Sequence, residues 1–138
     1  MTLRRKSREF ALQMLFQWDM NHQDPKLLEK TFWKSARAED RTRKFANQLF
    51  EDAVALAPEI DALVGKLSEN WQLDRLAVVD RGILRLAIAE LRLGTAPAKV
   101  VIDEALELGK KFSSPESPAF LNGILDAAYK SLEEKPEK

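Results

Sequence analysis

The chain has 138 residues, of which 45% are hydrophobic and 32% are charged, and this size and composition fit one globular domain with a buried core. Its 22 basic and 22 acidic residues give a formal net charge of zero, so any affinity for nucleic acid requires a local concentration of positive charge. The lack of cysteine excludes disulfides, thiolate catalysis and cysteine-ligated zinc, and agrees with a reducing cytoplasm. Because no stretch of 18 apolar residues occurs, we expect a soluble, cytoplasmic protein with no membrane partner.

The N-terminal segment joins a cationic run to an amphipathic helix that is expected to end near Asn21. The run consists of Arg4, Arg5, Lys6 and Arg8. Positive charges at a helix N-terminus oppose the helix dipole, so local helix stability gives no reason for them. Lys and Arg beside unpaired backbone N–H groups suit a phosphate. The run therefore indicates either a phosphate-binding site or a solvated, frayed end of the chain.

Helical periodicity continues through the next segments. Asp24 is a predicted N-cap, with Pro25 in the first turn of a second helix. A third helix is predicted over residues 42–57, and Pro58 either kinks it or begins a further helix. The side chains expected to face inward in this part of the chain are Leu28, Phe32, Trp33, Phe45, Leu49, Phe50, Leu56, Ile60, Leu63, Val64 and Leu67.

The second half of the chain predicts three more helices. A central helix over residues 76–93 is capped by Asp74 and closed by Gly94. A further helix begins at Pro97, and a loop over residues 113–118 precedes the last helix. The side chains expected to face inward here are Val100, Val101, Ala105, Leu108, Phe120, Leu121, Ile124, Leu125 and Ala128.

These patterns predict an all-α domain over residues 1–132, with six or seven helices packed as bundles. Residues 133–138 form a predicted polar tail. His22, the one side chain that titrates near neutral pH when unperturbed, lies near a helix end, where exposure is expected rather than catalysis. Nucleotide-binding, metalloprotease and nucleophile motifs are absent from the sequence, so no enzymatic activity and no cofactor are predicted.

Three features within the apolar helices call for an explanation. Arg85 and Glu90 interrupt the central helix, which predicts partly buried ion pairs with a neighbouring helix, and Glu104 is the candidate partner of Arg85. Gly123 lies inside the last helix at a cost of about 1 kcal/mol relative to alanine, and a close contact between helices would explain it. Phe120 either stacks on an unpaired base or packs in the core.

Four segments cover most of the chain in order: RRKSREFALQMLFQ (4–17), VDRGILRLAIAEL (79–91), PAKVVIDEALELGK (97–110) and FLNGILD (120–126). Together they resemble the successive motifs of the NusB family of bacterial transcription antitermination factors. The resemblance implies an all-α fold of two small bundles without catalysis. It also implies binding of the boxA RNA of ribosomal RNA leader transcripts together with NusE, a ribosomal protein of the small subunit, within the RNA polymerase antitermination complex.

The resemblance also implies which residues form the binding surface. Phe16 is expected on the side that binds the protein partner, at a position where some relatives have Tyr. Glu116 stands where related proteins carry Asp, which keeps the charge and changes the reach of the side chain. The residues expected to contact RNA are Arg4, Arg5, Lys6, Arg8, Asp80, Phe112, Glu116 and Phe120.

Two other functions are alternatives to this one. The same fold occurs as the N-terminal domain of ribosomal RNA cytosine methyltransferases, which need a cofactor-binding domain and a catalytic cysteine that this sequence does not contain. The second alternative is a helical protein-interaction module that does not bind RNA.

Overall fold

The computed structural model describes residues 2–68 and 77–134. Within these residues the chain forms six helices and no strand, which confirms the predicted all-α class. None of the described helices is both long and apolar enough to cross a membrane. The helices are α1 (Leu3–Asn21), α2 (Pro25–Ser35), α3 (Asp40–Leu67), α4 (Val78–Leu93), α5 (Ala98–Phe112) and α6 (Ser117–Glu134).

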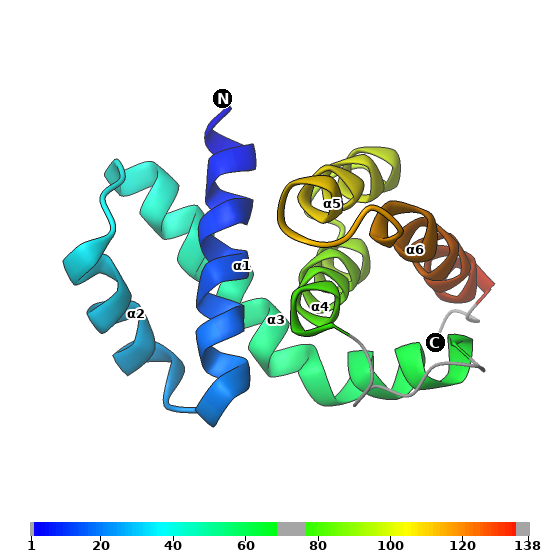
Figure 1. Cartoon of the computed structure of the whole chain (residues 1–138), viewed down its shortest axis with the longest axis horizontal. Coiled ribbons are helices and arrows are strands. Elements are labelled where there is room, and N and C mark those ends of the chain that lie inside the picture. The colour runs from blue at the N-terminus through cyan, green and yellow to red at the C-terminus, as the bar shows by residue number, and fades with distance from the viewer. Residues whose placement is uncertain (1, 69–76, 135–138) are drawn as a thin grey trace.

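The helices form two small bundles that share one long helix (Figure 1). Helices α1 and α2 lie on one side, α4, α5 and α6 lie on the other, and α3 passes along both. The helix is long because it continues through Pro58, although proline cannot donate the usual backbone hydrogen bond. Of the two possibilities at Pro58, a separate helix beginning there is therefore wrong.

Side chains from all six helices form one hydrophobic core. Most of the residues predicted to face inward are buried or packed against it, because the apolar stripe of each helix is a local property of the sequence. Val100 is an exception. The sequence pattern predicts that it faces inward, but 44% of it is exposed, because the buried face of α5 runs through Val101, Ala105 and Leu108.

The helix ends follow the predicted capping residues where the structure describes them. The Asp24 side chain accepts a hydrogen bond from the backbone N–H of Leu27 at 3.1 Å, and Gly94 closes α4 with a left-handed φ of 65°. Asp74, the predicted cap of the central helix, lies outside the described residues. The predicted loop is shorter than expected, because α6 already begins at Ser117.

The close approach of helices predicted at Gly123 is wrong. A Cβ atom at Gly123 would have no neighbour within 4 Å, because this residue lies on the exposed face of α6. The tight contact occurs at Gly109 of α5, where a Cβ atom would lie 2.8 Å from Leu121 Cδ1 of α6. Both glycines lie inside a helix, where glycine is less favourable than alanine. Only Gly109 lies on a buried face, so only there does helix packing need the missing side chain.

Candidate nucleic-acid interface

The cationic run forms the first turns of α1, and its members face different neighbours. Thr2 caps the helix by accepting a hydrogen bond from the backbone N–H of Arg5 at 3.1 Å. Arg4 and Lys6 are exposed, and the guanidinium of Arg4 lies 4.1 Å from the centre of the Phe45 ring of α3. These two cations lie where α1 meets the beginning of α3, since Lys6 lines a hollow that also contains Thr42.

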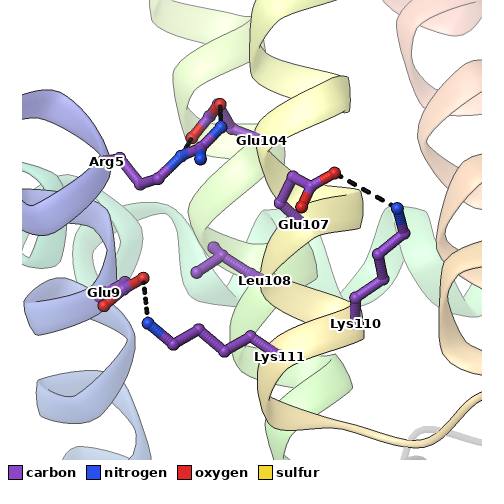
Figure 2. A pocket seen from close by; sticks show the side chains of 7 residues that line it. All are labelled: Arg5, Glu9, Glu104, Glu107, Leu108, Lys110 and Lys111. Atoms are coloured by element: carbon purple, nitrogen blue, oxygen red, sulfur yellow. Dashed lines mark hydrogen bonds and ion pairs between the residues drawn. The ribbon is translucent and has the colours of Figure 1, made fainter. Parts of the chain in front are cut away.

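Arg5 points to the opposite side of α1, toward α5 (Figure 2). Its Nε and Nη2 atoms donate to the two carboxylate oxygens of Glu104 at 3.0 and 2.7 Å. A second pair joins the same helices, because Lys111 Nζ lies 2.9 Å from Glu9 Oε2. The hydrogen bond from Arg5 outweighs the effect of burial and lowers the pKa of Glu104. These pairs line a shallow hollow of about 210 Å³ between α1 and α5.

Arg8 lies beneath the surface, with 4% of the residue exposed. Its Nε and Nη2 atoms donate to Glu90 of α4 at 2.7 and 2.9 Å, and the Thr95 hydroxyl donates to the same carboxylate at 3.1 Å. Burial lowers the pKa of Arg8, but the hydrogen bonds to Glu90 and the attraction of its negative charge together outweigh burial, so the pKa is raised. Local helix stability gives no reason for these cations, but tertiary structure gives one for Arg5 and Arg8, since each has a carboxylate partner on another helix.

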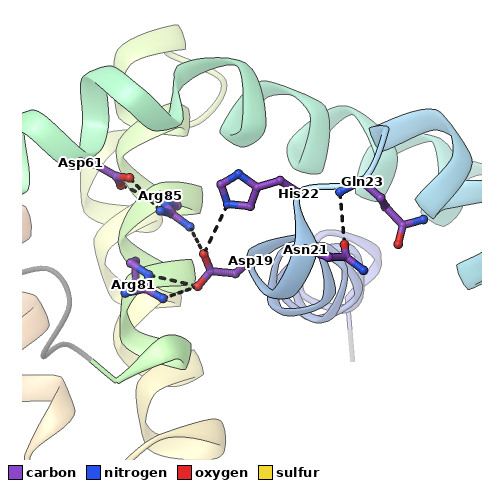
Figure 3. Close-up of polar contacts among 7 residues, drawn as sticks. All are labelled: Asp19, Asn21, His22, Gln23, Asp61, Arg81 and Arg85. Carbon is purple, nitrogen blue, oxygen red and sulfur yellow. Dashed lines mark hydrogen bonds and ion pairs between the residues drawn. The ribbon is translucent and has the colours of Figure 1, made fainter.

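Arg85 of the central helix, α4, has partners different from the predicted one (Figure 3). Arg85 donates to Asp19 of α1 at 3.0 Å and to Asp61 of α3 at 2.9 and 2.7 Å. The predicted pair with Glu104 is wrong, because Arg85 is bound by these two carboxylates and Glu104 accepts from Arg5 of α1 instead. Burial raises the pKa of Asp19, but hydrogen bonds from Arg81 and Arg85 outweigh it and leave the pKa lowered. The cluster joins α1, α3 and α4.

His22 is exposed, as predicted, with 61% of its side chain accessible. It ends α1 in the left-handed conformation with φ of 52°, and its ring stacks on Trp18 with the two centres 4.0 Å apart. Its Nε2 atom lies 4.0 Å from Asp19 Oδ1, beside the cluster of Figure 3. These contacts explain His22 as part of a helix end.

Asp80 connects the beginning of α4 to the turn before α6. The residue is buried, and its Oδ2 accepts a hydrogen bond from the Ser117 hydroxyl at 3.1 Å. Ser117 Oγ also lies 2.7 Å from Ser113 Oγ and accepts from the backbone N–H of Ser114 at 3.2 Å. Asp80 Oδ1 is buried without a hydrogen-bond partner among the described residues. These bonds fix the turn that presents the exposed Glu116.

Phe16 and Phe112 lie on one hollow of about 310 Å³, which Val79 also lines. Phe16 is 45% exposed and Phe112 is 37% exposed. The structure therefore brings together two aromatic residues that were predicted for different partners. Phe120 is half-buried and packs against the core, so core packing accounts for part of its ring.

The acidic and basic partners across the α1–α5 contact were not predicted from the sequence. Arg5 and Glu9 are one turn apart on α1, and Glu104 and Lys111 are two turns apart on α5. Each helix thus carries one acidic and one basic residue on the same face, a pattern that indicates two ion pairs between the helices. The pattern is informative only once α1 and α5 are known to be neighbours.

The fold is that of an all-α protein that presents exposed cations and partly exposed aromatic rings on its surface. No group of three or more acidic, His or Cys side chains able to hold a metal ion occurs in the part of the chain that the structure describes. The chain belongs to the NusB family, whose model matches residues 5–130.

Similarity to individual proteins extends over nearly the whole chain. The transcription antitermination protein NusB of Koribacter versatilis is 48% identical over 137 residues, which cover 98% of this chain and 94% of the relative. NusB of T. maritima is 34% identical with a TM-score of 0.82, covering 94% of this chain and 92% of the solved chain. A chain in the crystal structure of the antitermination factors NusB and NusE in complex with dsRNA is 32% identical with a TM-score of 0.82, covering 95% of this chain and 98% of the other.

Membership of this family makes the chain a transcription antitermination factor rather than an enzyme. The predicted family and the predicted lack of enzymatic activity are therefore confirmed.

Proposed function

We propose that this chain binds the boxA RNA of ribosomal RNA leader transcripts together with NusE in the cytoplasm, as part of the RNA polymerase antitermination complex. The observation that carries the proposal is the cationic first turn of α1, whose Arg4, Arg5 and Lys6 are exposed. A hollow farther along α1 presents the ring of Phe112. Phosphates and unpaired bases need these two kinds of group. A similar solved chain is found with NusE and dsRNA, which supports the same pair of partners here.

The predicted residues take different roles in this proposal. Arg4, Arg5 and Lys6 contact phosphates directly, while the buried Arg8 acts by fixing α1 on α4 through Glu90. This assignment replaces the direct phosphate contact expected for Arg8, because its guanidinium donates to a carboxylate and is covered.

The remaining predicted residues lie around the turn between α5 and α6. Phe112 and the exposed part of Phe120 offer ring surface to bases. Glu116 accepts hydrogen bonds from base amino groups or 2′-hydroxyls, and Asp80 holds its turn in place through Ser117. Phe16 extends the surface toward NusE.

A binding assay with boxA RNA and a scrambled RNA of equal length, each with and without NusE, tests the proposal. We expect tighter binding of boxA RNA, and NusE should strengthen it by the same factor by which the RNA strengthens NusE binding. Replacing Arg4 and Lys6 together by Gln should flatten the log-log dependence of RNA affinity on salt by about 0.7 for each phosphate that the variant no longer binds.

The matched control is the double variant Lys99→Gln with Lys130→Gln, whose exposed lysines pair with acidic residues on their own helices. It should bind boxA RNA with the salt dependence of the native protein. Equal affinity for boxA and scrambled RNA, unchanged by NusE, would contradict the proposal and favour the protein-interaction module without RNA binding.

A further inference from the structure

A large local excess of positive charge lies outside the N-terminal run. Residues 25–44 contain seven basic and three acidic residues, whereas the first 20 residues contain four basic and two acidic ones. The whole chain is neutral, so residues 25–44 carry the stronger positive region of the two. They form α2, the connection to α3 and the first turns of α3.

Four of these cations gather at one hollow of about 410 Å³ between α2 and α3. Lys26, Lys30 and Lys34 follow one another at intervals of one helical turn, about 6 Å along the axis, and are exposed. Lys30 and Lys34 form no ion pair among the residues that the structure describes. We name this hollow the α2–α3 basic surface, and its lining residues are Lys26, Glu29, Lys30, Trp33, Lys34, Arg43 and Asn47.

The floor of the α2–α3 basic surface is a fixed aromatic ring. The Trp33 Nε1–H donates to Asn47 Oδ1 at 2.8 Å, and the ring packs edge-on against Phe10 and Phe32 at centre distances of 5.1 and 4.9 Å. The guanidinium of Arg43 lies 5.4 Å from the centre of the Trp33 ring. The ring therefore has a settled orientation, with a cation held over it.

The acidic side chain at this surface does little to repel an anion. Glu29 is buried, and its burial together with a hydrogen bond to Glu51 raises its pKa to about 8, so it is largely uncharged at neutral pH. Glu51 itself pairs with Lys26 at 2.9 Å. The α2–α3 basic surface is thus positive at its rim and nearly neutral at its floor.

The α2–α3 basic surface adjoins the N-terminal cations. Lys6 of α1 lines a hollow with Thr42, and Arg43, the next residue of α3, lines the basic surface. We propose that the α2–α3 basic surface binds the phosphate backbone of RNA that extends beyond the element held at the N-terminal site. The inference rests on the proposed RNA-binding function and adds a second contact region to it.

RNA fits this surface better than an acidic protein does. The centres of protein interfaces are depleted of lysine and rich in apolar contacts, whereas here a row of lysines surrounds a single ring. Backbone-tracking surfaces for single strands combine spaced cations with aromatic side chains.

The test compares boxA RNA with the same RNA extended at its 5′ or 3′ end by about ten unpaired nucleotides, a length that one single-strand-binding surface can cover. Affinity is measured by fluorescence anisotropy over a range of salt, with NusE present throughout. The native chain is compared with the double variant Lys30→Gln with Lys34→Gln and with the control variant Lys99→Gln with Lys130→Gln.

We expect one of the two extensions to tighten native binding by about tenfold and to steepen the log-log salt slope by about 1.4, the value for two single-strand phosphates. The Lys30 and Lys34 variant should not show this gain and should bind the short RNA normally, while the control keeps the gain. The inference is wrong if neither extension increases the affinity, or if the Lys30 and Lys34 variant shows the same increase as the native chain. Neither result affects the proposed binding of boxA RNA itself.

Two further outcomes separate this inference from its alternatives. If the native chain binds neither the short nor the extended RNA, the proposed function fails as well. If the Lys30 and Lys34 variant binds both RNAs as the native chain does but has reduced affinity for the rest of the antitermination complex, the surface binds protein and the inference is wrong.

Discussion

Two glutamates are buried in different parts of the molecule and meet opposite surroundings. Glu90 of α4 is 2% exposed and accepts hydrogen bonds from Arg8 and Thr95. Glu29 of α2 is 6% exposed, but its neighbour is another carboxyl group, Glu51, and its Oε2 has no partner within the described part of the chain. Burial alone therefore does not decide what a carboxyl group does. Arg8 makes Glu90 part of an ion pair that links α1 to α4. Glu29 has no arginine beside it in the described part of the chain, and its pKa is raised instead.

Among the variants that test this comparison, Arg8→Ala is expected to have the largest effect on stability. The change leaves Glu90 buried without its cation, so we expect the free energy of unfolding to fall by about 3 to 5 kcal/mol. Urea denaturation measures this decrease. A double variant, Arg8→Met with Glu90→Leu, removes both charges and fills the space, and should cost little or even stabilise the protein. A decrease below about 1 kcal/mol for Arg8→Ala would mean that the pair behaves as a surface pair.

The raised pKa of Glu29 predicts that the stability of the protein depends on pH. Because folding raises the pKa of Glu29 from 4.5 to about 8, its contribution is fully present below pH 4.5 and is lost as the pH rises toward 8. The slope is at most about 1.4 kcal/mol per pH unit. Glu29→Gln keeps a neutral side chain and should remove this slope between pH 5 and 8 in urea denaturation.

Other shifted carboxyl groups do not interfere in that pH range. The pKa values of Asp19 and Glu104 are lowered, so their contributions are present above the ordinary pKa and are lost only as the pH falls below it. Parallel stability curves for the native protein and Glu29→Gln from pH 5 to 8 would show that Glu29 is charged in the folded state.

Local signals were sufficient for most of the fold. The apolar stripes, the Asp24 cap and the Gly94 turn depend on residues close in sequence, and apart from Val100 they were predicted correctly. The partners of Arg8 and Arg85 were not predictable in the same way. A guanidinium reaches whichever carboxylate the packing places beside it, and those carboxylates lie 24 to 82 residues away along the chain.

For the candidate site, the sequence likewise indicated individual residues but not how they are arranged in space. Family resemblance selected Phe16 and Phe112, but only the fold places them on one hollow. The basic residues of α2 were visible in the sequence as a charge excess, yet their meeting with Arg43 at Trp33 depends on how α2 packs on α3. Composition therefore indicates where charge is concentrated, and tertiary structure decides which charges act together.

The smallest expected effect concerns a third carboxylate, which lies at the surface. Glu104 holds Arg5 by two hydrogen bonds, so a phosphate that binds Arg5 has to compete with it. Glu104→Gln weakens that competitor without removing the cation, and we expect boxA RNA to bind about two- to fivefold more tightly, the range associated with an exposed ion pair. Stability should be nearly unchanged. The control is Asp103→Asn, which removes the same charge from an exposed position of α5, where Asp103 pairs with Lys99. An equal gain in both variants would reflect net charge alone, and no gain at Glu104 would place Arg5 outside the RNA contact. A gain confined to Glu104→Gln would show that, unlike the buried pair of Arg8 and Glu90, this pair is exchanged for RNA.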